Sequence, residues 1–499
     1  MLQDEFGMLP DVETIALCER IREGKIAMVR ATSVLPQARR TPGEPASKLR
    51  SGMRPNHTAI WTDSGQEEAF QAQIQLIGRK AELRTIEEML CQTECRVLTV
   101  TGVSGVGKTQ LLRAAGQRFR QAVMQISGTT AAGHWLPYHG IFFVSCLAAE
   151  AEPSLQQLTL NLQMLLTLGV AHQPVPPLQQ QVVDFLSEQP YLLILDNVHP
   201  SSTQPAYIDE LLKQTTGLRV LVASQKALNL SQEAVLPLEG LPIPQSDNQL
   251  RAQDAVQFFL QQGSRERKGW LADAEDLKNI GHLCRLLSGL PLAIELAASL
   301  SKNMDLIQLI HLLSLEVRDG TQQLTNQPSV QILLEQLWLI LDEQEQRALM
   351  RLSLFPESFS LRSAIELSMV SRAILDSLRA KNIIRWNGLT RRFFLPSPMR
   401  TYAVVRRSET PSLEQEATAR FCGYYANFAS SYAATNGAAE SLSPTVARVL
   451  IEEWHNLLQA WKWCGALRSN ATAKRLRASM EQLFAWYGIQ EGKFTPHHL

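Results

Sequence analysis

Short apolar runs alternate with segments of helical periodicity between residues 76 and 244 of this 499-residue chain. Four runs are apolar and rich in β-branched residues, which is typical of strands buried on both faces of a parallel sheet. They cover residues 97–101, 141–146, 191–195 and 219–223. The alternation predicts an α/β domain, a parallel sheet with helices on both faces, that ends in a proline-rich segment at Pro237, Pro242 and Pro244.

After this domain the pattern is almost entirely helical. The predicted helices cover residues 254–262, 274–287, 291–301, 330–341 and 343–354. Two short apolar runs, 383–386 and 393–395, then flank the turn residues Asn387 and Gly388, as in the β-hairpin of a small winged-helix unit. Beyond Pro411 helical spacing resumes to the end of the chain, with aromatic residues placed for helix–helix packing.

The first 70 residues differ from the rest in pattern. Residues 10–26 have the periodicity of one amphipathic helix. Residues 31–70 are rich in Pro, Ser, Thr and Arg and lack periodicity, which predicts a linker. The basic residues of this stretch are either solvated linker residues or a contact for an acidic partner.

Composition restricts the class of protein more than its function. At about 100–200 residues per domain, the length predicts three or four domains. Lys plus Arg and Asp plus Glu both number 48, so net charge gives no reason to expect nucleic acid, a membrane or an acidic substrate as a partner.

The cysteine spacing and the lack of targeting patterns both bear on the compartment in which the protein is expected. Seven cysteines are scattered along the chain, and the close pair Cys91 and Cys95 lacks the neighbouring Cys or His that a zinc site needs. We therefore expect buried thiols in a reducing compartment. No apolar run approaches the roughly 18 residues of a membrane span, and the N-terminus lacks the pattern of a signal peptide. A soluble cytoplasmic protein is expected.

A glycine-rich segment between the first strand and the next helix carries the most specific chemistry. It consists of Gly102, Val103, Ser104, Gly105, Val106, Gly107, Lys108 and Thr109, which fit the phosphate-loop pattern G-x-x-x-x-G-K-[ST]. In such a loop backbone N–H groups surround a phosphate chain, and the following helix, here from Gln110, points its positive end at the phosphates. Lys108 would reach the β- and γ-phosphates and the Thr109 hydroxyl would ligate Mg²⁺. The alternative is a glycine-rich turn without function, but the strand before and the helix after favour a nucleoside triphosphate site.

A second part of this site is expected at the end of the strand over residues 191–195. Asp196 follows this apolar strand, which suits a carboxylate that holds Mg²⁺ directly or through water beside the phosphate loop. Its alternative role is to cap a turn. The next residue is Asn197 rather than an acidic residue, so the obvious general base for water activation is missing. We predict Thr109 and Asp196 as metal ligands, Lys108 and Asp196 as the residues for any catalysis, and binding with slow or no hydrolysis.

Several segments in order resemble one family, the STAND class of P-loop switch ATPases (NB-ARC-like), in particular bacterial regulators of the AfsR/SARP and MalT type. They are residues 76–83 (LIGRKAEL), the phosphate loop, residues 192–197, 218–226, 237–242, 289–296 (GLPLAIEL), 400–403 (RTYA) and 454–457 (WHNL). The resemblance runs from residue 76 to the C-terminus, and the ordered series is more specific than any single motif. It implies that the nucleotide contacts are Gly78 and Arg79 near the adenine, the phosphate loop through Gln110, Gln225 of the sensor strand, and Pro291 against the base.

The resemblance also implies a division of the chain. A P-loop nucleotide-binding domain is followed by a helical lid, a winged-helix domain and the start of an α-helical, TPR-like repeat region. The expected boundaries are 73–245, 246–328, 329–407 and 408–499, after a linker over 28–72. Residues 1–27 are similar to the last helix of the bacterial transcriptional activation domain that precedes the ATPase in such regulators, or are a free-standing amphipathic helix. In the first case the chain begins and ends inside domains, as a fragment does.

Two positions depart from the family pattern. Gln225 stands where relatives carry an arginine that reads the γ-phosphate, and an amide cannot make the charge-assisted bidentate contact of a guanidinium. Lys226 is expected on the opposite face of the same strand. Residues 397–399 (SPM) contain no histidine in the place of the nucleotide-sensing histidine of plant immune switches. We therefore expect weak discrimination between ATP and ADP, or a degenerate switch.

These features favour a signalling switch with ATP or ADP and Mg²⁺ as cofactors, in which the nucleotide sets the angles between domains and exposes a surface for assembly. In the family's terms the output is transcriptional control, with protein partners on the helical C-terminal region, a nucleotide-dependent oligomer and no membrane. DNA contact is expected only from domains not evident in this chain, because Arg391 and Arg392 are too few to mark the hairpin as a groove reader. The alternatives are a true NTP hydrolase and a scaffold that nucleotide only stabilises.

Overall fold

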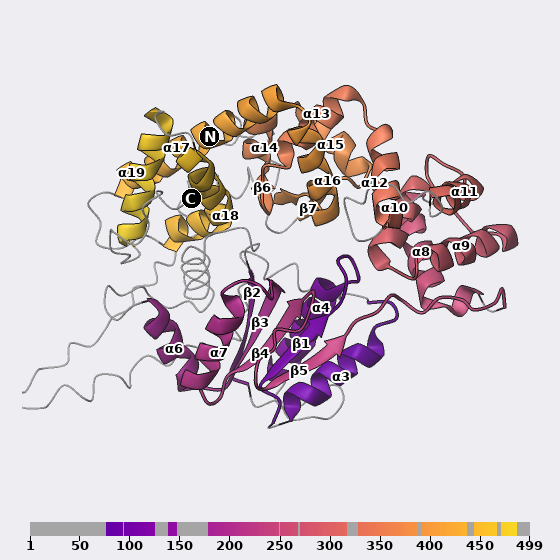
Figure 1. Cartoon of the computed structure of the whole chain (residues 1–499), viewed down its shortest axis with the longest axis horizontal. Helices are drawn as coiled ribbons and strands as arrows, with labels where there is room; N and C mark the ends of the chain where they lie inside the picture. Colours follow the sequence, from indigo (N-terminus) through magenta and orange to yellow (C-terminus); the bar gives the residue numbers. More distant parts are fainter. Residues whose placement is uncertain are drawn as a thin grey trace, which may run out of the picture. The chain divides into compact units, whose positions relative to one another are not determined.

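The structure is a computed structural model, and it describes residues 76–92, 94–124, 138–146, 178–248, 250–267, 270–316, 328–387, 391–436, 444–466 and 471–486 (Figure 1). These residues all belong to one compact unit of the chain, Thr58–Leu499. The helix predicted over residues 10–26, the linker and the likeness to an activation domain lie outside the described residues. No helix among those described is long and apolar enough to cross a membrane.

A five-stranded parallel sheet forms the first part of this unit. Its strands are β1 (Val97–Thr101), β2 (Gly140–Ser145), β3 (Tyr191–Val198), β4 (Arg219–Ser224) and β5 (Glu233–Pro237), in the spatial order β2-β3-β4-β1-β5. The four predicted strands and their parallel pairing are confirmed. The fifth, β5, was not predicted: it pairs with β1 at the edge of the sheet, and its residues are partly buried or exposed.

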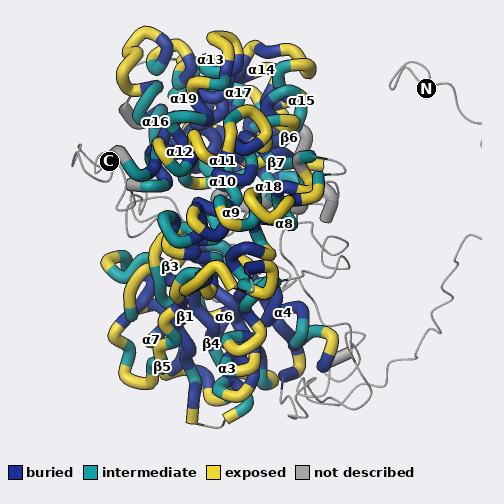
Figure 2. The backbone as a smooth tube through the Cα atoms, turned by 90° about the vertical axis from the view of Figure 1, so that its right-hand side faces the viewer, coloured by how far each residue is buried: buried dark blue, intermediate teal, exposed yellow. Residues whose placement is uncertain are grey.

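Helices cover both faces of this sheet, as the alternation of elements predicted. One face packs on α3 (Lys80–Cys91) and α4 (Lys108–Met124), and the other on α6 (Leu178–Glu188) and α7 (Gln204–Gln214). Alternate strand residues supply the two cores: Leu98 and Val100 of β1 join the first, and Val97 joins the second. Figure 2 shows the buried strands and the exposed outer sides of the helices.

The register of the strands brings their carboxyl ends to one edge. Thr101, the last residue of β1, pairs with Ser224 of β4. Ser145 of β2 pairs with Asp196 of β3. The phosphate loop that follows Thr101 and the Asp196 carboxylate therefore lie at the same edge of the sheet, which is where ligands bind in open parallel sheets.

The segment after the sheet is helical, as predicted. It comprises η2 (Leu250–Ala252), α8 (Asp254–Glu266), α9 (Ala274–Leu286), α10 (Pro291–Leu300), α11 (Leu306–Glu316), α12 (Pro328–Leu339) and α13 (Glu343–Leu352). The five predicted helices differ from these by a few residues at their ends, and α11 was not predicted. Two helices begin with complete capping boxes, at Asp273 before α9 and at Asp342 before α13, which satisfy the free N–H groups of their first turns.

A small antiparallel sheet and three helices come next. They are β6 (Ser358–Ser360), α14 (Leu361–Ser368), α15 (Arg372–Ala380), β7 (Arg385–Asn387), β8 (Arg392–Phe394) and α16 (Ser397–Ser408), and the strand order is β6-β8-β7. The predicted antiparallel pairing of the two apolar runs is confirmed, although the strands are shifted by one or two residues and Gly388 lies outside the described residues. The third strand, β6, was not predicted. Aromatic side chains hold the sheet, since the Phe393 ring lies 4.5 Å from Trp386 and 6.0 Å from Phe359.

Three long helices complete the described chain: α17 (Pro411–Asn436), α18 (Pro444–Ala466) and α19 (Ala471–Trp486). A buried polar network joins them to the small sheet. Arg392 of β8 donates to Glu453 of α18 at 2.7 Å and to the Ser358 carbonyl oxygen at 3.0 Å. Tyr425 of α17 and Asn456 of α18 donate to the second Glu453 oxygen at 2.8 and 2.7 Å. The guanidinium of Arg392 is therefore engaged inside the protein rather than offered to nucleic acid.

Candidate nucleotide-binding site

The phosphate loop has the backbone that its glycines allow. Gly102, Gly105 and Gly107 have φ values of +150°, +81° and +101°, which side-chain-bearing residues rarely adopt. At Gly102 a Cβ atom would also lie 2.6 Å from the carbonyl oxygen of Leu238. Helix α4 begins at Lys108, two residues earlier than predicted, so Lys108 and Thr109 form its first turn. The N-terminus of α4 thus faces the loop, as a phosphate site requires.

Lys108 lies against the loop itself. Its Nζ donates to the carbonyl oxygens of Gly102 at 2.7 Å and Val103 at 3.0 Å. Burial lowers the pKa of the Lys108 ammonium, and the nearby Asp196 carboxylate opposes that shift. The lysine is therefore held at the mouth of the loop, where a phosphate could replace the two carbonyls as its partner.

Thr109 and Asp196, the two residues predicted to hold Mg²⁺, lie in contact. The Thr109 hydroxyl donates to Oδ1 of Asp196 at 3.0 Å, and Asp196 is buried. Burial raises the pKa of this carboxyl, against the opposing effects of Arg113, the Thr109 hydrogen bond, the Asn197 backbone and Lys108. A hydroxyl and a buried carboxylate side by side are oxygen ligands of the kind Mg²⁺ prefers, so these residues fit the predicted metal.

Asn197 and Gln225, the residues behind the predictions of slow hydrolysis and weak discrimination, lie at an irregular point of β3 and beyond the end of β4. Asn197 has φ +61° and is exposed, and the pairing of β3 with β4 shifts register between Leu195 and Val198. Gln225 and Lys226 follow the end of β4 at Ser224, and both are exposed. The expectation that Lys226 lies on the opposite face of a strand from Gln225 is therefore wrong, because the strand ends before either residue.

The segment before α3 reaches the loop from outside the sheet. Gly78 has φ +68°, and a Cβ there would lie 2.7 Å from Cβ of Asp254 at the start of α8. Arg79 is buried, and its guanidinium donates to the Val106 carbonyl oxygen of the phosphate loop at 3.2 Å. Sequence patterns do not reveal this contact, because a backbone acceptor has no residue type to recognise.

Helix α10 begins on the phosphate loop. Its first residue is Pro291, and the Leu292 N–H donates to the Gly105 carbonyl oxygen at 3.2 Å. A Cβ on Gly105 would lie 2.6 Å from the Leu292 side chain. Just before α10, the Gly289 carbonyl oxygen accepts from Leu241 N–H at 2.7 Å. Gly240 and Gly289 lie here on main chains in contact, since a Cβ on Gly240 would lie 2.2 Å from the Ser288 carbonyl oxygen, and one on Gly289 2.1 Å from that of Leu241.

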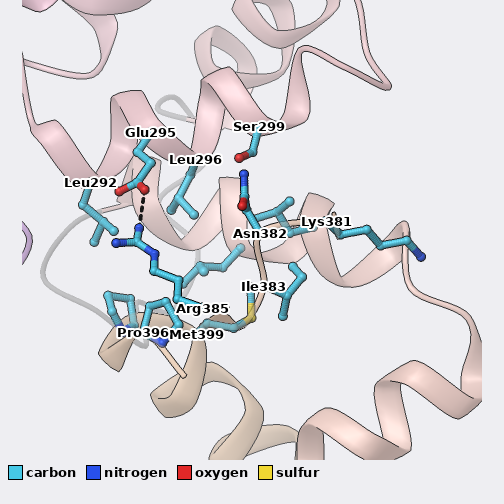
Figure 3. A pocket seen from close by; sticks show the side chains of 13 residues that line it. Leu292, Glu295, Leu296, Ser299, Lys381, Asn382, Ile383, Arg385, Pro396 and Met399 are labelled. Atoms are coloured by element: carbon cyan, nitrogen blue, oxygen red, sulfur yellow. Dashed lines mark hydrogen bonds and ion pairs between the residues drawn. The ribbon is translucent and has the colours of Figure 1, made fainter. Parts of the chain in front are cut away.

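A pocket lies along the same helix (Figure 3). Glu295 and Leu296 of α10 line it from one side, and residues 381–383, Arg385 and the start of α16 from the other. The carboxylate of Glu295 forms an ion pair with Arg385 of β7, drawn as a dashed line in Figure 3. Helix α10 therefore contacts the phosphate loop at its first turn and the small antiparallel sheet one turn later.

Residues 75–223 match the family of AAA ATPase domains. The match ends at β4, so it includes the phosphate loop, Thr109 and Asp196 but neither β5 nor the later helices.

The chain is similar to two proteins of Mycobacterium tuberculosis. An uncharacterized protein is 28% identical over 236 residues, which are 47% of this chain and 52% of that protein. A protein named as a putative HTH-type transcriptional regulator is 25% identical over 422 residues, which are 80% of this chain and 43% of that protein. The chain spans about half the length of the curated relatives it matches. The predicted resemblance to P-loop ATPases of regulatory proteins is confirmed.

Among solved structures, the chain is similar to a STAND protein with a tetratricopeptide repeat sensor from Pyrococcus horikoshii. The two are 16% identical with a TM-score of 0.48, over 86% of this chain and 53% of that one.

Proposed function

We propose that this chain is an ATP- and ADP-binding signalling switch within a transcriptional regulator, with slow or no hydrolysis of ATP. The observation that carries the proposal is the hydrogen bond from Leu292 N–H to the Gly105 carbonyl oxygen. It attaches the first turn of the lid helix α10 to the loop that a nucleotide would fill. A ligand that moves the loop therefore acts on the lid, which is the differential contact that a switch needs.

In the bound state the phosphate loop, from Gly102 to Thr109, would hold the phosphates, with Gln110 in the first turn of α4. The Lys108 ammonium would exchange its two carbonyl partners for phosphate oxygens. Thr109 and Asp196 would hold Mg²⁺, which neutralises phosphate charge. Gly78 and Pro291 are the proposed neighbours of the base, at the two segments that meet the loop from outside the sheet.

The proposed signal travels through α10 to a winged-helix domain over residues 329–407. Support comes from the ion pair between Glu295 of α10 and Arg385 of β7. A second link joins the ATPase sheet to the same segment, since the Ser145 hydroxyl of β2 donates to Glu357 at 3.3 Å. The other Glu357 oxygen contacts Nδ1 of His455 on α18 at 2.9 Å. Two separate contacts thus couple the ATPase domain and its lid to the small antiparallel sheet and α18.

Slow hydrolysis is proposed because of the residues near Asp196. The neighbouring position holds an exposed Asn197, whose amide cannot accept a proton from water. Gln225 is exposed and uncharged at the end of β4, so it supplies no cation to a γ-phosphate. Both residues favour retention of nucleotide over turnover, and weak discrimination between ATP and ADP.

The regulatory role rests on the relative named as a putative HTH-type transcriptional regulator. In our proposal α17–α19 begin a TPR-like region that binds protein partners, and nucleotide controls an oligomer. The small antiparallel sheet serves as a packing module, because Arg392 is buried against Glu453. DNA contact would come from another part of the regulator.

The first test is to denature the purified protein and identify the released nucleotide by chromatography. Hydrogen exchange of α10 and residues 381–387 is then compared with ATP, with ADP and without nucleotide. We expect bound ADP, and a change in exchange when ATP replaces it. An exchange pattern identical in both nucleotides would support the scaffold, and turnover well above about 1 per second would support a true hydrolase.

A further inference from the structure

Arg79 makes contacts that differ from those of a residue that binds a base. We infer that Arg79 is a positioning residue: its guanidinium fixes the orientation of the phosphate loop and ties that loop to the segment that enters the lid. The inference rests on the proposed function, since it concerns how the same nucleotide site is held in shape.

Both terminal nitrogens of the Arg79 guanidinium have protein partners. Nη1 donates to Oε1 of Glu82 at 2.7 Å. Nη2 donates to the Val106 carbonyl oxygen at 3.2 Å and to the Glu239 carbonyl oxygen at 2.5 Å. The residue is 5% exposed. A guanidinium that is buried and committed to three acceptors is not available to an adenine ring.

The contact with Val106 acts on the nucleotide site through peptide geometry. The C=O of one residue and the N–H of the next point in opposite directions in a trans peptide. When Arg79 holds the Val106 carbonyl, it also fixes the direction of the Gly107 N–H. That N–H belongs to the phosphate loop, whose backbone donors surround the phosphates. Arg79 thus aims a phosphate donor without touching the ligand.

The contact with Glu239 extends this support to the lid. Glu239 directly precedes Gly240, where the chain leaving β5 meets residues 288–289 in front of α10. Helix α10 in turn donates from Leu292 to Gly105 of the loop. The loop, Arg79, the chain after β5 and the start of α10 form a closed ring of contacts. Arg79 joins this ring through a charged side chain, whereas the Leu292–Gly105 and Leu241–Gly289 links are made by main chain.

The two possible roles of Arg79 predict different effects of its substitution on ligand affinity. If Arg79 contacts the base, its loss lowers the affinity for ATP and leaves the affinity for a ligand without a base unchanged. If Arg79 positions the phosphate loop, its loss lowers the affinity for every ligand that carries the phosphate chain. The probes are therefore MgATP, MgGTP and inorganic tripolyphosphate, each measured by competition against a fluorescent ADP analogue on the full chain.

The main variant is Arg79→Gln. We expect it to lower the affinity for all three ligands by a common factor of about tenfold, as loss of charge-assisted hydrogen bonds implies. Arg79→Lys retains the charge but not the fork that spans two carbonyls, so an intermediate common loss is expected. It replaces Arg79→Gln if that variant does not fold.

Two matched controls remove ion pairs without reaching the loop. Glu82→Gln removes only the negative charge of the Nη1 partner of Arg79, and Arg118→Gln removes the pair between Arg118 of α4 and Glu87 of α3. Both should bind all three ligands within about twofold of wild type. A loss confined to ATP would overturn the inference in favour of a base contact, and no loss in either Arg79 variant would overturn it outright. If wild type itself binds none of the three ligands, the proposed function fails rather than the role of Arg79 within it.

Discussion

Arg392 of β8 and Glu453 of α18 are 61 residues apart in the sequence and share a hydrogen bond of 2.7 Å in the interior. Both side chains are 7% exposed. Tyr425 and Asn456 satisfy the remaining carboxylate oxygen, so three elements meet at one charge pair. The small sheet and the helices α17 and α18 are thereby joined as one body.

Removal of one partner of this pair should destabilise the C-terminal part of the chain. Arg392→Ala leaves the Glu453 carboxylate buried without its cation, at a cost of about 3–5 kcal/mol. We expect a lower thermal midpoint and rapid proteolysis between α16 and α18. Arg362→Ala is the matched control, because it removes an exposed ion pair with Glu366 and should change stability by less than about 0.5 kcal/mol. Equal midpoints for the two variants would contradict the assigned role of the network.

The predicted metal ligands can be tested through the dependence of binding on Mg²⁺. Lys108→Ala removes the cation at the mouth of the loop and should abolish nucleotide binding. Asp196→Ala should retain part of the affinity but lose its dependence on Mg²⁺, because Thr109 alone holds a metal weakly. Calorimetric titration with and without EDTA measures both effects. Tight binding by the Lys108 variant would refute the assignment of the phosphate loop.

Asp196 should also make the ligand-free protein less stable as the pH rises. Burial raises the pKa of this carboxyl above its usual 3.8, so the folded chain holds the proton more tightly than the unfolded chain. That contribution to stability is present below about pH 4 and is lost as the pH rises through the folded pKa. Asp196→Asn cannot ionise and should raise the free energy of unfolding by about 0.5–2 kcal/mol at pH 8, and by less at pH 4. The midpoint is followed by thermal scans in EDTA between about pH 4 and 8, and a difference independent of pH would count against this account.

Gln225 is expected to limit the preference for ATP. An arginine there would add a charge-assisted contact to a γ-phosphate that ADP lacks. Gln225→Arg should therefore raise the affinity for ATP relative to ADP by about tenfold. Gln225→Met, which adds no charge, should leave the ratio unchanged. Calorimetric affinities for both nucleotides decide the matter, and an unchanged ratio in the arginine variant would show that position 225 does not reach the phosphate.

Glu357 should control how firmly the end of β2 is held to α18. Burial alone would raise the pKa of this carboxyl, but His455, Arg400 and the Ser145 hydroxyl lower it below 4.5, so the ionised form is the one bound. Its contribution to stability is present above pH 4.5 and is lost as the pH falls through the folded pKa. Glu357→Gln should raise hydrogen exchange of β2 by about two- to fivefold at pH 7, as for loss of a partly exposed carboxylate contact. Glu366→Gln on α14 serves as the control, and similar exchange in both variants would remove this contact from the proposed switch.

Those parts of the fold whose pattern is local and continuous were predictable from the sequence. Residues 97–101 form a strand with the predicted limits because every position is apolar or β-branched and buried or nearly so. Strand β5 escaped prediction because it lies at the sheet edge, where Val235 is exposed and Glu233 and Pro237 form its ends. Strand β5 forms by pairing with β1, and the residues of β5 carry no pattern that indicates this pairing.

In the candidate site, too, the parts with a local sequence pattern were predictable and those without one were not. The phosphate loop, Thr109 and Asp196 follow from a motif and a strand end, and their contact agrees with that prediction. Arg79 was predicted from the family pattern to lie near the base, whereas its observed partners include two main-chain oxygens 27 and 160 residues away. Backbone acceptors leave no trace in the order of side chains, so this role required the structure.

Gly240, which follows β5, passes Gly289, which precedes α10, with main chain directly against main chain. The joint has no clearance for even one added methyl group. Such a joint opens as a gap only at the cost of the hydrogen bond from Leu241 N–H to the Gly289 carbonyl oxygen. It can turn or slide in place, so movements of the lid here should be pivots of small amplitude that longer elements, such as α10, convert into larger displacements at their far ends.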